Sequence, residues 1–138
     1  MKILIVNGPN LNLLGSREPE IYGNRTFDNY LKELQAMFPS ADIDLFQSNI
    51  EGEIIDALHA AAKKYDAVLL NAGGYTHTSV AIADAVGAIG IDVVEIHMSS
   101  ILSREEFRHT SLIAPKCKGS IMGFGLDSYR LGVLSVLR

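Results

Sequence analysis

The sequence contains a single cysteine, Cys117, among 138 residues. One thiol excludes an internal disulfide and a cysteine-rich zinc site, and it is typical of a reducing compartment. A basic cluster is also missing, because twelve Lys and Arg residues are set against sixteen Asp and Glu residues for a net charge of −4. Nucleic-acid binders need a basic surface that attracts phosphates. We therefore expect a small-molecule partner and no nucleic acid.

Long apolar runs are absent as well. The apolar stretch at residues 3–6 is too short for a membrane span or for the apolar part of a signal peptide. No linker, internal repeat or low-complexity segment interrupts the chain. With 48% apolar residues, a chain of this length can bury a substantial core. We expect one domain over residues 1–138, located in the cytoplasm and without contact to a membrane.

Short runs rich in β-branched residues predict strands that are buried on both faces. Residues 3–6, 67–70 and 93–96 have this composition, and polar or turn residues close each run. Residues 42–46 alternate between polar and apolar side chains, which predicts a strand near a sheet edge. Residues 119–123 predict a last short strand.

Apolar residues with helical spacing lie between these strands. One stripe covers residues 27–38 and stops before Pro39, which cannot continue a helix. A second helix over residues 54–62 follows Ser48 and Glu51, which have the spacing of a capping box. The pattern therefore predicts a helix on each side of the strand at residues 42–46.

The remaining helices are predicted from their ends. Thr78 or Ser79 is expected to cap a third helix that Gly90 terminates. Residues 103–106 again have capping-box spacing, and residues 126–137 predict the closing helix. Strands that alternate with helices in this way imply right-handed crossovers and a parallel sheet covered on both faces. The predicted fold class is α/β, a flavodoxin-like three-layer sandwich with a five-stranded parallel sheet.

Polar loops follow three of the predicted strands, at residues 7–12, 71–77 and 95–100. In open parallel sheets, ligands bind outside the carboxyl ends of the strands. Asn and Gly also make ordinary turns, which would explain any one of these loops. Three such loops at the same end of a sheet favour a binding site, and we expect an active site where they meet.

Two histidines lie inside these polar loops, His77 and His97. Glu95 precedes His97 by two residues, so both side chains point to the same face of a regular strand. A carboxylate in that place would orient the imidazole and favour its charged form, which suits a general acid. His59 and His109 are expected to be structural.

The connection after the first strand is about twenty residues long where about six are usual, which is typical of a lid. It carries Arg17 and Tyr22, five positions apart. A guanidinium near a phenol lowers the pKa of the phenol, so that Tyr22 can act as a base. The alternative is that Arg17 pairs with Glu18 or Glu20 on the surface while Tyr22 packs against the domain.

Ordered motifs extend over nearly the whole chain. They are NGPNLNLLG at 7–15, REPxxYG at 17–23, QSNxEG at 47–52, NAGxYTHTS at 71–79, EIHMS at 95–99, RExFR at 104–108 and GFG at 123–125. Several motifs of this length are far more specific than a lone glycine pattern. Together they resemble the type II 3-dehydroquinate dehydratases, the small dehydroquinases of the shikimate pathway and of quinate catabolism.

The resemblance implies an anti elimination of water from 3-dehydroquinate through an enolate, which gives 3-dehydroshikimate. By that resemblance Tyr22 is the base that removes the proton from C2, and Arg17 on the same lid keeps it anionic. His97 protonates the departing C1 hydroxyl, with Glu95 behind it. Asn10 holds a water near the enolate oxygen. This division of roles agrees with the chemistry, because enolate formation needs a positioned base and donors aimed at the oxyanion.

The resemblance also implies the substrate contacts, the cofactors and the assembly. The implied substrate-binding groups are Asn71, His77, Asp84, Arg108 and the backbone of Met98 and Ser99. Asp84 reaches the substrate across a subunit boundary in a dodecamer built from trimers, and no cofactor, metal or Schiff base takes part. Three positions depart from the family pattern, with Ser100, Ile50 and Gly74 where asparagine, histidine and alanine are common.

Two other classes of protein remain to be weighed. A flavodoxin or a phosphoryl receiver shares the predicted fold, but the first needs a hydroxyl- and glycine-rich phosphate loop and the second an acidic cluster. The first and third strands run into Asn7 and Asn71 instead. The other class is a catalytically silent homologue of the enzyme, and the presence of the proposed acid and base residues argues against it.

Overall fold

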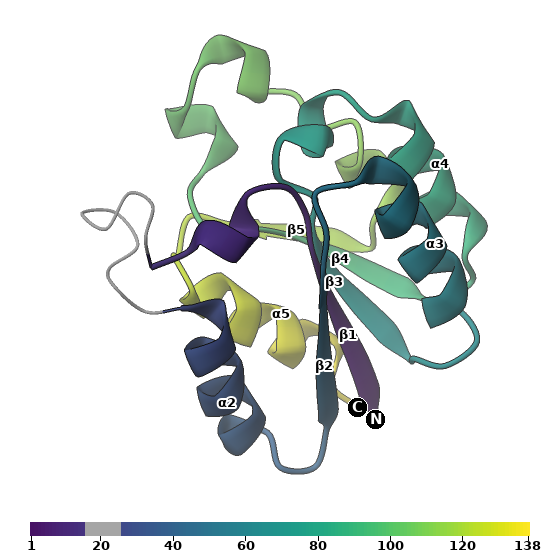
Figure 1. Cartoon of the computed structure of the whole chain (residues 1–138), viewed down its shortest axis with the longest axis vertical. Helices are drawn as coiled ribbons and strands as arrows, with labels where there is room; N and C mark the ends of the chain where they lie inside the picture. The colour runs from purple at the N-terminus through teal and green to yellow at the C-terminus, as the bar shows by residue number, and fades with distance from the viewer. Residues whose placement is uncertain (16–25) are drawn as a thin grey trace.

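The computed structural model describes residues 1–15 and 26–138 (Figure 1). Within these residues five strands form one parallel sheet in the order β2-β1-β3-β4-β5. The strands are β1 (Lys2–Asn7), β2 (Asp42–Gln47), β3 (Ala67–Asn71), β4 (Asp92–His97) and β5 (Gly119–Met122). This is the strand order of the flavodoxin-like fold. The predicted fold class and the five predicted strands are confirmed, with β2 at a sheet edge.

Helices cover both faces of the sheet, which makes three layers (Figure 1). On one face lie α2 (Phe27–Met37) and α5 (Asp127–Val136), and on the other lie α3 (Glu51–Ala61) and α4 (Val80–Ala88). Short 3-10 helices lie in the loops after the strands: η1 (Leu11–Leu13), η2 (Gly73–His77), η3 (Ile101–Ser103), η4 (Glu106–Arg108) and η5 (Ala114–Lys116). None of the helices in the described ranges is long and apolar enough to cross a membrane.

The side chains of β1 divide the core into two apolar layers. Ile3 and Ile5 are buried against α2 and α5, whereas Leu4 and Val6 are buried against α3 and α4. This follows from the pleat, because successive side chains on a strand point to opposite faces. β3 is buried along its whole length because it lies in the middle of a sheet that helices cover on both faces. The rigid centre of the sheet thus holds the carboxyl ends of β1 and β3 in place.

The capping box predicted for the second helix is wrong in its partners. The N-cap of α3 is Ile50, which has no side-chain acceptor. The hydroxyl of Ser48 accepts instead from the Ile50 amide at 3.0 Å and donates to Glu53. Glu51 accepts a hydrogen bond of 2.6 Å from Ser79, the N-cap residue of α4. A tertiary partner therefore takes the carboxylate that local spacing assigned to a cap.

The later helix ends give a mixed result. Ser79 caps α4 as predicted, since its hydroxyl accepts from the amide of Ile82 at 2.9 Å. The expected terminator Gly90 lies beyond the extended C-cap Ile89 and has no positive φ. The second capping-box pair starts no α-helix, because η3 and η4 are single 3-10 turns. There the hydroxyl of Ser103 bonds to a backbone carbonyl nearby, which competes with helix formation.

Candidate active site

A pocket of about 140 Å³ opens at the carboxyl ends of β1, β3 and β4. Its residues from the three polar loops are Pro9, Asn10, Asn71, Gly73, Gly74, His77, His97, Met98 and Ser99. Leu11, Leu14, Ile101, Arg104 and Arg108 complete the wall. The three loops thus meet in one place. The segment that carries η3 and η4, drawn in green in Figure 1, lies past the carboxyl ends of the strands.

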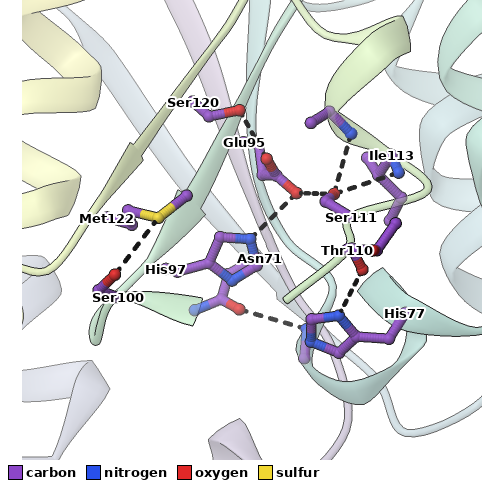
Figure 2. A network of polar contacts seen from close by, with 12 residues as sticks. Asn71, His77, Glu95, His97, Ser100, Thr110, Ser111, Ile113, Ser120 and Met122 are labelled. Atoms are coloured by element: carbon purple, nitrogen blue, oxygen red, sulfur yellow. Dashed lines mark hydrogen bonds and ion pairs between the residues drawn. The ribbon is translucent and has the colours of Figure 1, made fainter. Parts of the chain in front are cut away.

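Glu95 is a buried carboxylate directly behind His97. Its side chain is surrounded by donors (Figure 2). Oε2 lies 3.0 Å from Nε2 of His97 and accepts from the hydroxyl of Ser111 at 2.5 Å, and Oε1 accepts from the hydroxyl of Ser120 at 2.6 Å. Burial by itself raises the pKa of Glu95, but the contacts with His97, Ser111 and Ser120 outweigh it and lower the pKa below the usual value. The group is therefore held as a carboxylate in a place where a lone charge would be costly.

The ion pair decides what each nitrogen of His97 can do. A carboxylate only accepts, so the proton between the two side chains belongs to Nε2. The short distance is that of an ion pair, and the ring N–H is not aligned well enough for a regular hydrogen bond. No described residue bonds to Nδ1 of His97, whose ring lines the pocket. Nδ1 is thus the atom that can exchange a proton with a ligand.

His77 is oriented in a comparable way. Its Nδ1 lies 2.9 Å from the backbone carbonyl oxygen of Thr110 (Figure 2). A carbonyl oxygen only accepts, so Nδ1 carries the proton and Nε2 of the neutral ring is an acceptor. His77 can therefore accept a hydrogen bond from a ligand hydroxyl in the pocket.

Asn71 is fixed by a buried hydrogen-bond network that includes Tyr129 of α5. Its Nδ2 donates to the hydroxyl of Tyr129 at 2.9 Å, and this hydroxyl donates to Oδ1 of Asn7 at 2.8 Å. Oδ1 of Asn71 accepts from the amide of Gly73 at 3.2 Å. Burial raises the pKa of Tyr129, so its hydroxyl stays protonated and can serve both amides. These bonds leave one N–H of Asn71 for a ligand.

Two arginines supply positive charge at the pocket wall. Arg104 reaches Oγ of Ser99 at 3.4 Å, and Arg108 forms a 3.3 Å ion pair with the exposed Glu105. Guanidinium groups are suited to carboxylate recognition because their donors lie in a planar fork. The pocket therefore brings a histidine paired with a carboxylate together with two guanidinium groups.

The backbone beside His97 is held by the glycine motif after β5. The amide of Gly125 donates to the carbonyl oxygen of Met98 at 2.8 Å. The amide of Gly123 donates to the carbonyl oxygen of His97 at 3.3 Å. Both glycines have positive φ, 97° for Gly123 and 62° for Gly125, a conformation that other residues rarely adopt. This fixes the peptide units at Met98 and Ser99 at the edge of the pocket.

Some of the expected site residues lie elsewhere. Asp84 is exposed on α4 and does not line the pocket of its own chain. Arg17 and Tyr22 lie outside the described residues. Glu95 contacts the pocket only through His97. The structure thus brings together the implied groups of the three loops and Arg108, and leaves Asp84 apart.

Sequence reasoning missed several residues of the site. Arg104 lines the pocket, and only its place in the RExFR motif signalled it. Ser111, Ser120 and Tyr129 lie outside the three polar loops, and their contacts arise from the fold alone. No local pattern could have identified them.

The three departures from the family pattern are accommodated without strain. Ile50 is exposed, and a Cβ added at Gly74 would meet no atom within 4 Å. The hydroxyl of Ser100 caps η3 by accepting from the amide of Leu102 at 3.3 Å. Serine at position 100 therefore has a structural role of its own at the start of η3.

The fold and the pocket define a flavodoxin-like α/β protein whose site is suited to acid–base chemistry on a small anion. A family model described as Dehydroquinase class II matches residues 1–137. The chain belongs to this family, and the resemblance predicted from its motifs is confirmed.

Individual relatives agree with this membership. A 3-dehydroquinate dehydratase of Rhizobium johnstonii is 53% identical over 137 residues, which cover 95% of this chain and 92% of that protein. A 3-dehydroquinate dehydratase of Trichodesmium erythraeum is 51% identical over 137 residues, covering 98% and 91%. The crystal structure of a type II dehydroquinase from Butyrivibrio crossotus matches with a TM-score of 0.93 at 42% identity, covering 98% of this chain and 96% of that one.

Proposed function

We propose that this protein is a 3-dehydroquinate dehydratase, which removes water from 3-dehydroquinate by anti elimination and releases 3-dehydroshikimate. The observation that carries the proposal is the buried pair of Glu95 and His97 at the wall of the pocket. Relatives that are half identical to this chain are named for this reaction. Their similarity extends over almost the full length, so it includes every segment that lines the pocket.

His97 is the general acid in this mechanism. Elimination breaks the C1–O bond, and the leaving hydroxyl needs a proton to depart as water. Nδ1 of His97 supplies that proton while Nε2 stays against Glu95, 3.0 Å away. The carboxylate stabilises the charged ring before transfer and holds its orientation afterwards. Glu95 acts through His97 and has no contact with the substrate.

Tyr22 and Arg17 complete the reaction on the other face of the substrate ring. The phenolate of Tyr22 takes the proton from C2, and the electron pair of that bond forms the enolate at C2, C3 and the ketone oxygen. Collapse of the enolate restores the C3 ketone and forms the C1=C2 double bond as the C1 hydroxyl leaves. Arg17 stabilises the phenolate by its fixed positive charge.

The other groups of the pocket bind the substrate and stabilise the enolate. Asn10 holds a water at the enolate oxygen. Asn71 and His77 hold ring hydroxyls through the N–H and the Nε2 atom that their internal hydrogen bonds leave available. The substrate carboxylate binds the backbone of Met98 and Ser99, and Arg108 adds positive charge there.

The setting of the enzyme is part of the proposal. We infer that it acts in the cytoplasm, in the shikimate pathway of aromatic amino-acid biosynthesis or in quinate catabolism. It forms a dodecamer built from trimers, in which the exposed Asp84 reaches the substrate of a neighbouring subunit. The single domain of residues 1–138 needs no cofactor, so activity is expected to survive metal chelators and borohydride.

The experiment that tests the proposal follows the ultraviolet absorbance of the conjugated enone product. Purified protein is mixed with 3-dehydroquinate, and the initial rate of the absorbance rise is expected to be proportional to enzyme concentration. Circular dichroism of the same sample shows that the protein is folded. A folded protein that gives no rise would reject the activity and leave a silent homologue as the better interpretation. A yellow sample would instead point to FMN binding.

A further inference from the structure

Asn49 belongs to the QSNxEG motif, to which the proposed function gives no role, and it lies against the loop that carries Asn10. Its Oδ1 accepts from the backbone N–H of Asn10 at 3.0 Å and from Nε2 of Gln47 at 3.2 Å. Both partners are donors, so the atom between them is the amide oxygen. Gln47 also donates to the carbonyl of Gly8 at 3.2 Å. The two side chains therefore hold the loop after β1 at Gly8 and at Asn10.

Asn49 is itself fixed by the polar loop that follows β3. The hydroxyl of Tyr75, in η2, donates to the backbone carbonyl of Asn49 at 3.1 Å. The side chain of Gln47 starts from the last residue of β2, which pairs with Asn7 at the end of β1. Asn49 thus connects the loops that follow β1, β2 and β3.

The backbone of Asn10 has an unfavourable conformation, which an anchor of this kind would stabilise. Its φ is 70°, and no other non-glycine residue in the described part of the chain has a positive φ. Its N–H has no hydrogen-bond partner there except Asn49. Its own side chain bonds to no described residue and lines the pocket. The backbone of Asn10 is therefore held from outside while its amide remains available to a ligand.

We propose that Asn49 is a positioning residue that holds Asn10 in the left-handed conformation and so directs the Asn10 amide at the reacting centre. The proposal rests on the proposed function, in which Asn10 holds a water at the enolate oxygen. The enolate charge develops during the reaction and is absent from the bound substrate. Loss of the anchor therefore lowers kcat more than it changes KM.

Two variants of Asn49 differ in whether an oxygen acceptor remains at this position. Asn49→Asp keeps an oxygen acceptor of the same shape, whereas Asn49→Ala removes it. Misplacement of a site group by about 1 Å costs up to about 10²-fold in rate. Asn49→Ala is expected to lose at least about tenfold in kcat with KM within about threefold of wild type. Asn49→Asp is expected to stay close to wild type.

Thermal unfolding and a matched control exclude a general loss of structure. Asn29→Ala changes an exposed asparagine on α2 whose side chain makes no hydrogen bond to the described residues, and it is expected to leave kcat unchanged. Asn49→Ala is expected to unfold at the temperature of wild type. A wild-type kcat in Asn49→Ala overturns the proposal. So does equal loss in Asn49→Asp, or a loss of kcat that follows a lowered unfolding temperature.

Hydrogen exchange tests the same anchor without turnover. If wild-type protein does not convert 3-dehydroquinate, the proposed function fails, and the exchange of a peptide covering residues 7–12 decides the positioning role by itself. Mass spectrometry is expected to show faster amide exchange in Asn49→Ala than in wild type and Asn49→Asp. Equal exchange in the three proteins overturns the positioning role.

Discussion

Glu95 and His97 form a buried ion pair in which Oε2 and Nε2 lie 3.0 Å apart. Two residues of one strand make this contact because side chains at i and i+2 share a face of the sheet. The remaining partners of Glu95 come from elsewhere, since Ser111 lies between η4 and η5 and Ser120 lies in β5. Three segments therefore determine how the imidazole is presented to the pocket.

The first prediction concerns the contribution of Glu95 to stability at different pH values. The folded-state pKa of Glu95 lies below its unfolded value of about 4.3, so the ionised carboxylate stabilises the folded state. This contribution is complete above the unfolded pKa and is lost as the pH falls through the lower, folded pKa. The difference in free energy of unfolding between wild type and Glu95→Gln is expected to shrink as the pH falls below about 4. Urea titrations at several pH values measure it, and a constant difference would contradict the prediction.

The second prediction concerns the hydroxyl of Tyr129. Tyr129→Phe leaves the buried amides of Asn7 and Asn71 without their shared partner, so the free energy of unfolding is expected to fall by about 1–3 kcal/mol. The matched control is Tyr65→Phe, whose hydroxyl donates to the exposed Asp44 and is expected to cost less than about 1 kcal/mol. Equal losses of unfolding free energy in the two variants would show that the buried network stabilises the fold no more than an exposed hydrogen bond does.

The third prediction uses two glycines of the pocket region. A Cβ on Gly8 would lie 2.6 Å from the carbonyl oxygen of Ala72, and backbone cannot move aside as a side chain can. Gly8→Ala is expected to destabilise the protein by about 1–3 kcal/mol. Gly74→Ala has open space around it and is expected to change stability by less than about 0.5 kcal/mol. Thermal unfolding of both variants tests the contrast, and a stable Gly8→Ala would refute it.

The fourth prediction tests the proposed base. Tyr22→Phe removes one hydroxyl and little volume, so substrate binding is expected to persist while turnover falls by about 10²-fold or more. Calorimetry with substrate measures binding and the enone absorbance measures turnover. Normal turnover in the variant would reject the role of Tyr22 as base.

The fifth prediction tests whether Asp84 serves a neighbouring subunit. Asp84→Ala and His97→Ala are each expected to be nearly inactive when purified separately, because each lacks one component of every site. Subunits of the two variants that are unfolded together and reassembled are expected to regain activity, since some sites combine a normal His97 with a normal Asp84. Co-assembled wild-type protein controls for refolding. Mixtures that stay inactive would place Asp84 in the site of its own chain or outside any site.

The strands and the fold class were predictable because their signals are local. A run such as residues 67–70 is apolar on both faces, and only a strand covered by helices on both sides buries it completely. The start of α3 was harder to predict, because Glu51 bonds to Ser79, the N-cap residue of α4, a partner that its sequence neighbours do not reveal. Capping patterns describe local bonds and fail where a tertiary bond is stronger.

The site divides in the same way. The sequence by itself determined which residues end the central strands, and therefore which loops border the pocket, because parallel strands with helical crossovers all end at the same edge of the sheet. The order of the strands came only from the structure. It also placed Glu95 and His97 on one face of a strand. Only the tertiary structure decided which nitrogen of His97 is left for a ligand, and which side chains hold Asn10 and Asn71. Those contacts join residues as far apart as Asn7 and Tyr129, and a hydrogen bond of that kind depends on positions in space that spacing along the chain does not specify.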